Sequence, residues 1–588
     1  MIAVGRLRAL GSTASLAVVA ALGLPQVAGA QTVGYDNVGS DTSSDPTVTA
    51  NADADTNKPA RSSKRGGKGN GRGNGAKHID VVPYIELDQI VTADITPGSD
   101  VLTYTQAVVG VDATIAGRNN ALSASVRYAH QIGWGKKAND GDQISGIARG
   151  YTRIAPGLTV EAGALATRTN SYGGTSSGIG SSSLGGGSFG GNQTVYSVYA
   201  GPALTQRVGD LNISASYRLG YTKVTQDGDR SVGSFDTFDE SIVQVADLEA
   251  GFSPGTLLPV GVGVAASGYQ ENISNLDQRV RDFQARALVT VPVSRTVQVV
   301  GAVGYEDVEV SSRDAKRNAD GTPMVGSDGR YVTDKSSPRQ ISYDVSGLIW
   351  DVAVMWRPSP RTSLSAHIGR RYGSISYGGN LSYAPSDRSQ LSISVYDNIS
   401  GYGGQVNRLL GELSDDFEAV RDPVTGQLQG CVATLDGNNC LSGVLGSLRS
   451  STFRARGVTA SYSIQIGRRL SAGIGVGYDR RNYIAAQGTV LASANGVIDE
   501  NTWLAAYIGG QLSRRDGWSA NTYVRWVSTN DLVSGDETGY GASASYYRNF
   551  LPRLRGTVAV AIDGVSSNTP SIDDIWSASA LAGLRYSF

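Results

Sequence analysis

The carboxyl-terminal segment of the chain, residues 575–588, has two different faces. Every second residue from Trp576 to Phe588 is apolar, with aromatic side chains at both ends, whereas the positions between them are mostly small or polar. Because side chains alternate between the two sides of a β-strand, one side of this segment is apolar and bounded by aromatic residues. A strand that crosses a membrane in a barrel needs this pattern, and a tilted strand of this length rises about 30 Å. The segment therefore predicts a transmembrane β-strand.

The same alternation recurs in other segments. Residues 458–466 place Val458, Tyr462 and Ile466 on one side and Ser461 and Ser463 on the other, and residues 470–478 and 518–526 repeat the pattern. Small and polar inner positions suit a wall that borders water or packed polar material, and they do not build the apolar core of a soluble sandwich. The 76 Gly and 28 Tyr and the slightly negative mean hydropathy agree with strands that are apolar on one side only.

The connections between these segments sort by length. Short connections lie at 117–119, 155–157, 357–361, 467–469 and 551–553, and the alternate set contains the long ones at 171–192, 225–240, 310–341, 400–451 and 482–500. Short periplasmic turns and long extracellular loops are the asymmetry of bacterial outer-membrane barrels. The sequence predicts an all-β chain that forms a single large transmembrane antiparallel β-barrel in the outer membrane, with about 22 strands and a compatible range of about 18 to 22.

The expected strands follow from the alternation and the turns. They lie at 80–94, 101–116, 120–133, 143–155, 157–170, 193–206, 210–224, 241–253, 258–270, 281–293, 295–309, 342–357, 361–373, 375–385, 388–399, 452–467, 469–481, 501–513, 516–529, 539–550, 554–563 and 575–588. An even number places both ends of the barrel on the periplasmic side.

The amino-terminal residues 1–30 are typical of a signal peptide. Arg6 and Arg8 precede a mostly apolar run, and Ala28-Gly29-Ala30 provides a small-residue cleavage site. An uncleaved membrane anchor is the alternative, which the short apolar run and Pro25 disfavour. No later segment reaches about 18 uninterrupted apolar residues, so we expect no transmembrane helix after residue 30.

Residues 31–78 are predicted to form a disordered periplasmic tail that precedes a barrel of residues 79–588. The tail is poor in large apolar residues, and it carries a basic, glycine-rich tract from Lys58 to Lys77. Behind a signal peptide this tract has no nucleic acid to bind, so a solvated tether is favoured over a binding arm, for which peptidoglycan or lipid head groups would be the targets. A formal net charge of −1 also argues against a general binder of polyanions.

The histidines give little support to an enzyme. Of the three, His78 falls in the predicted tail, His130 on the predicted lipid side and His367 on the inner side. One inward histidine among scattered Ser and Asp does not define a hydrolase triad, and the chain has no phosphate loop, dinucleotide fingerprint or zinc-ligand spacing. We expect no enzymatic activity, no metal site and no cofactor.

The two cysteines, Cys431 and Cys440, both fall in the longest connection. In an oxidising compartment, two cysteines this close predict a disulfide that closes a small ring. Metal binding is disfavoured because two thiolates alone are an incomplete site.

Apolar residues recur at helical spacing upstream in the same connection. They are Leu409, Leu410, Leu413, Phe417 and Val420. A short amphipathic helix here would either fold back into the barrel as a constriction or lid, or lie at the surface and stabilise the loop.

Four charged residues are expected to point into the lumen: Asp112, Arg127, Asp479 and Arg525. Rings of charge tune pores. Charges that pair with one another inside the barrel are the simpler interpretation, and it is favoured here.

The alternating residues Leu584, Tyr586 and Phe588 at the end of the chain resemble the carboxyl-terminal assembly signal of bacterial outer-membrane β-barrels. The resemblance implies the barrel-assembly machinery as a partner. It also implies a lipid bilayer with lipopolysaccharide as the surroundings.

The segments Val82–Leu87, Leu102–Thr105 and Gly110–Ile115 resemble the first strands of porin-type barrels often associated with exopolysaccharide export. The resemblance covers the start of the barrel, implies a passive conduit or assembly partner for polymer secretion, and assigns no functional residue. The function expected from the sequence is a non-enzymatic, porin-like channel for hydrophilic solutes or secreted polysaccharide. The alternative is a structural or adhesive barrel that acts through its long extracellular loops.

Overall fold

The computed structural model describes residues 78–588 apart from 97, 99, 137, 139, 173–174, 177–190, 228–236, 414–416, 435–438, 441–447, 532–534 and 569–573. The predicted signal peptide (1–30) lies outside the described residues, as does the predicted tail except for His78. In the part of the chain that the structure describes, no helix is long and apolar enough to cross a membrane.

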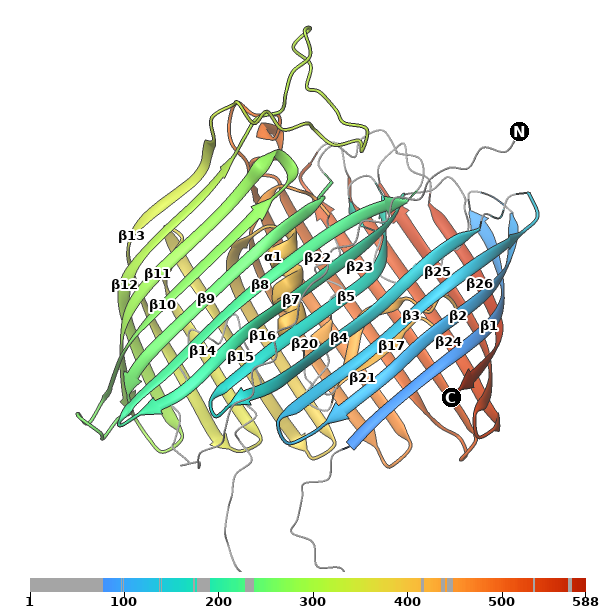
Figure 1. Cartoon of the computed structure of the whole chain (residues 1–588), viewed down its shortest axis with the longest axis horizontal. Coiled ribbons are helices and arrows are strands. Elements are labelled where there is room, and N and C mark those ends of the chain that lie inside the picture. Colours follow the sequence, from blue (N-terminus) through green and yellow to red (C-terminus); the bar gives the residue numbers. More distant parts are fainter. Residues whose placement is uncertain are drawn as a thin grey trace, which may run out of the picture. The chain divides into compact units, whose positions relative to one another are not determined.

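The chain forms a closed antiparallel barrel of 22 strands (Figure 1). The strands are β1 (His78–Thr96), β2 (Val101–Ala116), β3 (Asn120–Trp134), β4 (Gly141–Ala155), β5 (Leu158–Tyr172), β7 (Gly191–Val208), β8 (Leu211–Asp227), β9 (Glu240–Phe252), β10 (Gly261–Ile273), β11 (Gln278–Pro292), β12 (Val297–Ser312), β13 (Gln340–Ser359), β14 (Thr362–Arg371), β15 (Ser374–Ser386), β16 (Ser389–Ser400), β20 (Thr452–Ile466), β21 (Leu470–Ile484), β22 (Ile498–Gln511), β23 (Asp516–Thr529), β24 (Glu537–Leu551), β25 (Leu554–Ser567) and β26 (Ile575–Ser587). Each strand pairs with the next one in this order, and β1 pairs with β26 to close the barrel.

The predicted fold class and strand number are confirmed, and the predicted strands match the observed ones to within about three residues at most ends. The first strand begins at His78, which pairs with Ala116, one position before the predicted start of the barrel at residue 79. The sorting of connections is also confirmed. One end of the barrel carries short turns such as 156–157 and 552–553, and the other end carries the long connections at 313–339 and 401–451.

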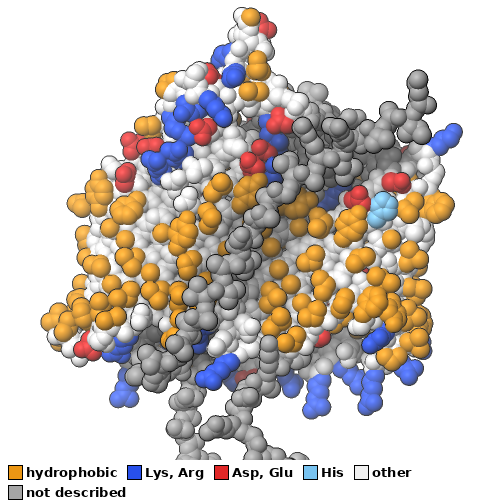
Figure 2. All heavy atoms as spheres, in the orientation of Figure 1, with side chains coloured by type: hydrophobic (Ala, Val, Ile, Leu, Met, Phe, Trp, Pro, Cys, Tyr) orange, Lys and Arg blue, Asp and Glu red, His pale blue; other side chains and the backbone are white. Residues whose placement is uncertain are grey.

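The two faces of each strand are sorted as the alternation predicts. On β26, Leu584 is 51% exposed and faces outward, whereas its neighbours on the inner side, Ser577, Ser579 and Leu581, are buried. Figure 2 shows the outward apolar side chains as a broad band across the visible face of the barrel, with charged side chains above and below it. Closing the sheet pairs the strand edges, which a bilayer requires because lipid offers no hydrogen-bond partner to the backbone.

The connection between β16 and β20 does not stay outside. It contains the helix α1 (Tyr402–Gly411) and a small sheet of β17 (Phe417–Arg421), β18 (Leu428–Thr434) and β19 (Asn439–Cys440). The helix contacts β5, β7, β8, β9 and β16 through their inner faces, and Figure 1 shows it inside the barrel. We call residues 401–413 and 417–434 the luminal segment. Among the described residues, the remaining short elements are β6 (Thr175–Ser176) and the 3-10 turns η3 (Asn275–Asp277) and η4 (Ala492–Ala494).

Candidate functional site

A buried carboxylate on the barrel wall holds the start of the helix α1. Glu271 of β10 is fully buried and accepts hydrogen bonds from the backbone N–H groups of Gly401 (2.6 Å) and Gly404 (2.9 Å) and from the Tyr269 hydroxyl (2.6 Å). The first N–H groups of a helix have no partner within the helix, and the positive end of the helix dipole favours an anion there. Glu271 therefore replaces a local capping residue with an anchor from the wall.

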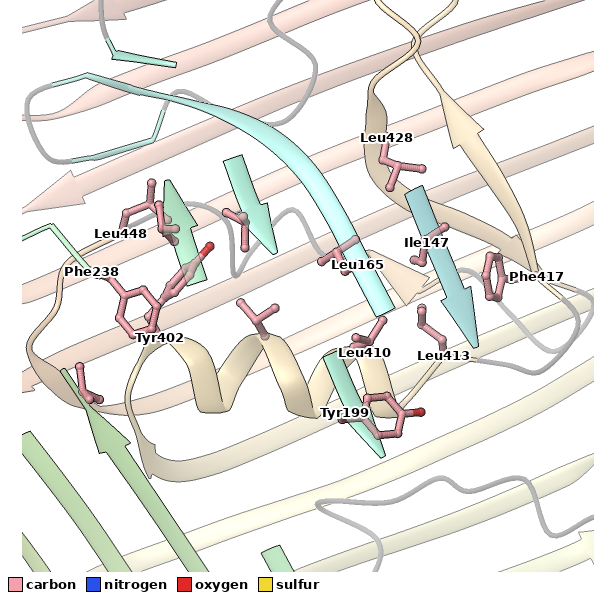
Figure 3. Close-up of a cluster of buried hydrophobic side chains, with 14 residues drawn as sticks. Ile147, Leu165, Tyr199, Phe238, Tyr402, Leu410, Leu413, Phe417, Leu428 and Leu448 are labelled. Carbon is pink, nitrogen blue, oxygen red and sulfur yellow. The ribbon is translucent and has the colours of Figure 1, made fainter. Parts of the chain in front are cut away.

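The apolar side of α1 packs on the inner wall. Tyr402, Val406 and Leu410, spaced by one helical turn, are fully buried in one cluster with Phe238 and Tyr199 (Figure 3). The rings of Phe238 and Tyr402 lie 5.0 Å apart at 55°, a tilted arrangement that aromatic pairs favour. The helix is therefore packed along its length rather than suspended in the lumen.

The helix begins earlier than the apolar spacing predicts. The sequence suggested a helix around Leu409 to Val420, whereas α1 ends at Gly411 and Phe417 begins a strand. Of the predicted apolar set, Leu410, Leu413 and Phe417 are buried in the cluster around the helix and Leu409 packs against it. The early start depends on Gly404, where a Cβ would collide with the hydroxyl of Tyr269. Glycine is a poor helix former in isolation, so the sequence of this segment alone does not predict that the helix starts here.

The turn between β17 and β18 reaches the opposite wall. Arg127 of β3 donates through Nη1 to the carbonyl oxygen of Thr425 at 3.0 Å, and Arg421 donates through Nη1 to the hydroxyl of Ser145 at 2.7 Å. Val424, at the tip, is fully buried among apolar residues of β1, β2, β25 and β26. The luminal segment therefore crosses the barrel and is fixed at both sides.

The four predicted lumen charges all have polar partners, and they do not form one site. Arg127 also lies 3.4 Å from Glu86 and donates to Gln106 at 2.8 Å. The partners of the others are Ser125 (2.7 Å) and Arg585 (2.8 Å) for Asp112, Tyr396 (2.7 Å) and Arg481 (2.7 Å) for Asp479, and Asn501 (2.8 Å) for Arg525. Most of these partners come from neighbouring strands of the wall, whereas Arg127 also reaches the luminal segment through its hydrogen bond to Thr425.

The other predicted site residues fall where the chain pattern places them. Leu584, Tyr586 and Phe588 are all exposed on the outer side at the end of β26. His130 faces outward and lies 2.8 Å from Asp142, whereas His367 lines the lumen. No cluster of His, Cys, Asp or Glu suited to a metal ion occurs among the described residues.

Cys431 and Cys440 lie directly opposite each other on β18 and β19. Directly opposed residues of an antiparallel pair have Cα atoms about 4.5 or 5.5 Å apart, within the range that a disulfide requires. The predicted disulfide is therefore compatible with the backbone.

We expect the disulfide to be present in protein isolated from the outer membrane, because the periplasm is oxidising. Trypsin should release both cysteines on one peptide, Asp422–Arg449, since no Lys or Arg lies between its ends. Mass spectrometry should find this peptide alkylated only after reduction. Alkylation of both thiols in the unreduced protein would contradict the pairing.

A cavity of about 250 Å³ lies beside α1 on the inner wall. Four of its charged groups form close pairs within the wall: Arg371 donates to both carboxylate oxygens of Asp282 at 2.7 Å, and Arg286 lies 2.5 Å from Asp351. The side chain of Tyr372 joins them with a 2.9 Å hydrogen bond to Asp282. The cavity thus presents closely paired charges of both signs together with aromatic rings.

Sequence reasoning missed the residues that build this site. Tyr372 lies at the tight turn between β14 and β15, where Tyr372 and Gly373 both have positive φ (55° and 66°). A non-glycine residue with positive φ is uncommon, and here the buried contacts of Tyr372 hold it. The local signal for Glu271 was its position two residues after Tyr269, which puts both on the same side of the strand.

No family model and no curated protein matches this chain. Among solved structures, it is similar to the ferric-catecholate import receptor Fiu from E. coli (TM-score 0.41, 9% identity, 86% of this chain and 81% of that one). It is also similar to the FrpB iron transporter from Neisseria meningitidis (TM-score 0.41, 11% identity, 86% and 81%). A third similar structure is the FauA receptor from Bordetella pertussis (TM-score 0.37, 12% identity, 86% and 76%).

The location follows from the barrel itself. Twenty-two paired strands with an outward apolar band and sorted connections are the construction of bacterial outer-membrane barrels. The chain is an outer-membrane β-barrel. Its short turns therefore face the periplasm, and its long connections face the outside of the cell.

Proposed function

We propose that this outer-membrane barrel is a passive channel for hydrophilic solutes, constricted by its own luminal segment, and that secreted polysaccharide belongs to the same class of solute. The observation that carries the proposal is the cavity beside α1, where Asp282, Asp351, Arg286 and Arg371 form close pairs next to Tyr372. Paired charges offer donors and acceptors without a strong net field, and aromatic faces stack on the apolar faces of sugars. Such a lining suits neutral, hydroxyl-rich solutes.

The size of the barrel supports a constricted channel. A barrel of 22 strands is wider than the 16- to 18-stranded porins and is usually plugged. Here the luminal segment crosses the lumen and is held at both walls, by Glu271 on one side and by Arg127 on the other. Reconstituted protein should conduct ions in planar bilayers, and liposomes that contain it should swell in small sugars faster than in large ones. Absence of both conductance and sugar flux would contradict the proposal.

The charge pairs of the cavity give a sharper test. Arg286→Gln removes the cation that lies 2.5 Å from Asp351 and leaves the carboxylate without it. We expect reversal potentials to shift toward cation selectivity by roughly 1 kcal/mol, or about fivefold in the permeability ratio, as expected for one unit charge partly screened by water. Arg281→Gln is the matched control, because Arg281 lies on the same strand and is exposed on the outer side. An equal shift in both variants would mean that the cavity does not line the ion path.

A second candidate function is adhesion through the outer connections. The connection between β12 and β13, residues 313–339, forms a projection held by isolated bridges such as Ala315 to Thr333 (Figure 1). Met324 and Val325 on this projection are exposed. Deleting residues 316–332 should reduce attachment to surface polymer without altering conductance if adhesion is the function.

A further inference from the structure

The periplasmic turns on one side of the barrel carry a run of exposed arginines. Four successive turns, between β15 and β16, β20 and β21, β22 and β23, and β24 and β25, contribute them. We call Arg388, Arg468, Arg469, Arg514, Arg515 and Arg553 the arginine arc, and all six are exposed.

Backbone hydrogen bonds make the arc continuous. Each turn is bonded to the strand end beside it, so that neighbouring turns lie next to one another along the rim. These bonds run from Gln465 N–H to Arg388 O (2.7 Å), from Gln511 N–H to Arg469 O (2.9 Å), from Asn549 N–H to Arg515 O (2.8 Å) and from Ser587 N–H to Arg553 O (2.9 Å). The six guanidinium groups therefore share one edge of the barrel on a rigid scaffold.

The acidic residues on these turns pair with other arginines. Asp387 forms its ion pair with Arg361, and Asp516 lies 3.7 Å from Arg548. Among the described residues, none of the six members of the arc forms an ion pair. Arg388 donates one long hydrogen bond, 3.4 Å, to the carbonyl oxygen of Gly467. The arc thus keeps a concentrated positive charge.

The arc lies directly at the edge of the apolar band. Ile466, Leu512 and Leu551 are exposed and adjoin three of the arginine-bearing turns, and Phe588 ends the neighbouring strand. Because apolar side chains face the hydrocarbon and the turns leave it, the arginines lie at the level of the head groups of the periplasmic leaflet. That leaflet consists of phospholipid, whose phosphates match the planar, bidentate donor pattern of a guanidinium.

We propose that the arginine arc binds anionic phospholipid head groups, of the phosphatidylglycerol class, in the periplasmic leaflet. Zwitterionic lipids carry the same phosphate but cancel its charge, so the dense positive field of the arc selects lipids with a net negative charge. Each arginine near an anionic lipid surface contributes roughly a fivefold preference. The barrel would then hold a shell of anionic lipid along this side.

The test compares lipid binding by the full-length protein and a fourfold variant. Protein in neutral detergent is titrated with phosphatidylglycerol or with phosphatidylcholine, and bound lipid is counted by native mass spectrometry. We expect the wild-type protein to prefer phosphatidylglycerol and R468Q/R469Q/R514Q/R515Q to lose at least about tenfold of this preference. The charge-conserving variant with lysine at the same four positions should retain most of the preference for phosphatidylglycerol, because that preference depends on positive charge.

The matched control is R281Q/R317Q/R370Q/R480Q, which removes four exposed arginines away from the periplasmic rim. Equal losses in the control and in the rim variant would assign the effect to overall charge and overturn the proposal. Equal binding of the two lipids by the wild-type protein would also overturn it. If the rim variant keeps its lipid preference but loses binding to purified peptidoglycan, the arc recognises the cell wall and the proposal is wrong. Heat-modifiable gel mobility checks that each variant is folded.

Discussion

Removing the luminal segment should raise the single-channel conductance of the protein several-fold and admit larger sugars. The deletion is feasible because Ser400 and Phe453 are paired neighbours at the ends of β16 and β20. A short glycine-rich turn can therefore replace residues 402–451, which contain all of the luminal segment except Gly401. The effect is large because a 22-stranded barrel without filling has a wide lumen. Planar-bilayer recording and liposome swelling with graded sugars measure it.

The projection between β12 and β13 provides the control deletion. Ala315 and Thr333 are bridged, so residues 316–332 can be removed with equal ease, and this connection lies outside the lumen (Figure 1). We expect its removal to leave conductance unchanged. If the two deletions give the same conductance as the wild-type protein, the luminal segment does not limit the pathway.

The second large effect is expected from Glu271→Ala. The change leaves three donors without their acceptor: the N–H groups of Gly401 and Gly404 and the hydroxyl of Tyr269. Hydrogen bonds to a charged group contribute about 1.5–3 kcal/mol each, so the helix should lose on the order of 3 kcal/mol of local stability. Hydrogen exchange of the α1 amides should then accelerate about a hundredfold, since local opening controls exchange. Bilayer recordings should show added current fluctuations.

Glu500→Ala is the control for this prediction. The side chains of Glu500 and of its ion-pair partner Arg480 (3.4 Å) are 44% and 45% exposed, so the loss of this pair should change neither exchange in α1 nor conductance, as expected for surface pairs. Glu271→Gln should fall between the wild-type protein and the alanine variant, because an amide keeps one acceptor oxygen. Unchanged protection of α1 in Glu271→Ala would show that the apolar packing of Tyr402, Val406 and Leu410 alone holds the helix.

Sequence patterns predicted the strands that form the wall of this barrel but not the segment that fills its lumen. The strands were predictable because side chains alternate between the two faces of a strand, which is a pattern of neighbouring residues. Leu584 faces outward and Leu581 faces inward by position alone. The inward direction of Asp112 and Arg127 followed from the same rule. Their partners did not, because Asp112 meets Arg585 across 473 positions of sequence.

The luminal segment is the clearest case of a structure that the sequence did not decide. Its apolar residues predicted a helix that would either constrict the lumen or lie at the surface, and nothing in the sequence decided between the two. The structure places it inside, and moves its start to Tyr402, because Glu271 from a strand 130 positions away accepts the first helical N–H groups. Gly403 and Gly404 allow the helix to approach the wall closely. Judged by local helix propensity alone, the same two glycines predict a poor helix.

The sequence by itself determined the class of fold, the membrane, the positions of the strands and the side on which each connection lies, because all of these depend on local alternation and on the length of turns. Only the tertiary structure decided what fills the lumen and which charges meet there. Closing the sheet brings β10, β3 and the connection after β16 together, and contacts such as Glu271 with Gly401 or Arg127 with Thr425 exist only after that closure. The same closure sets the periplasmic turns side by side, so that arginines scattered along the sequence become one arc.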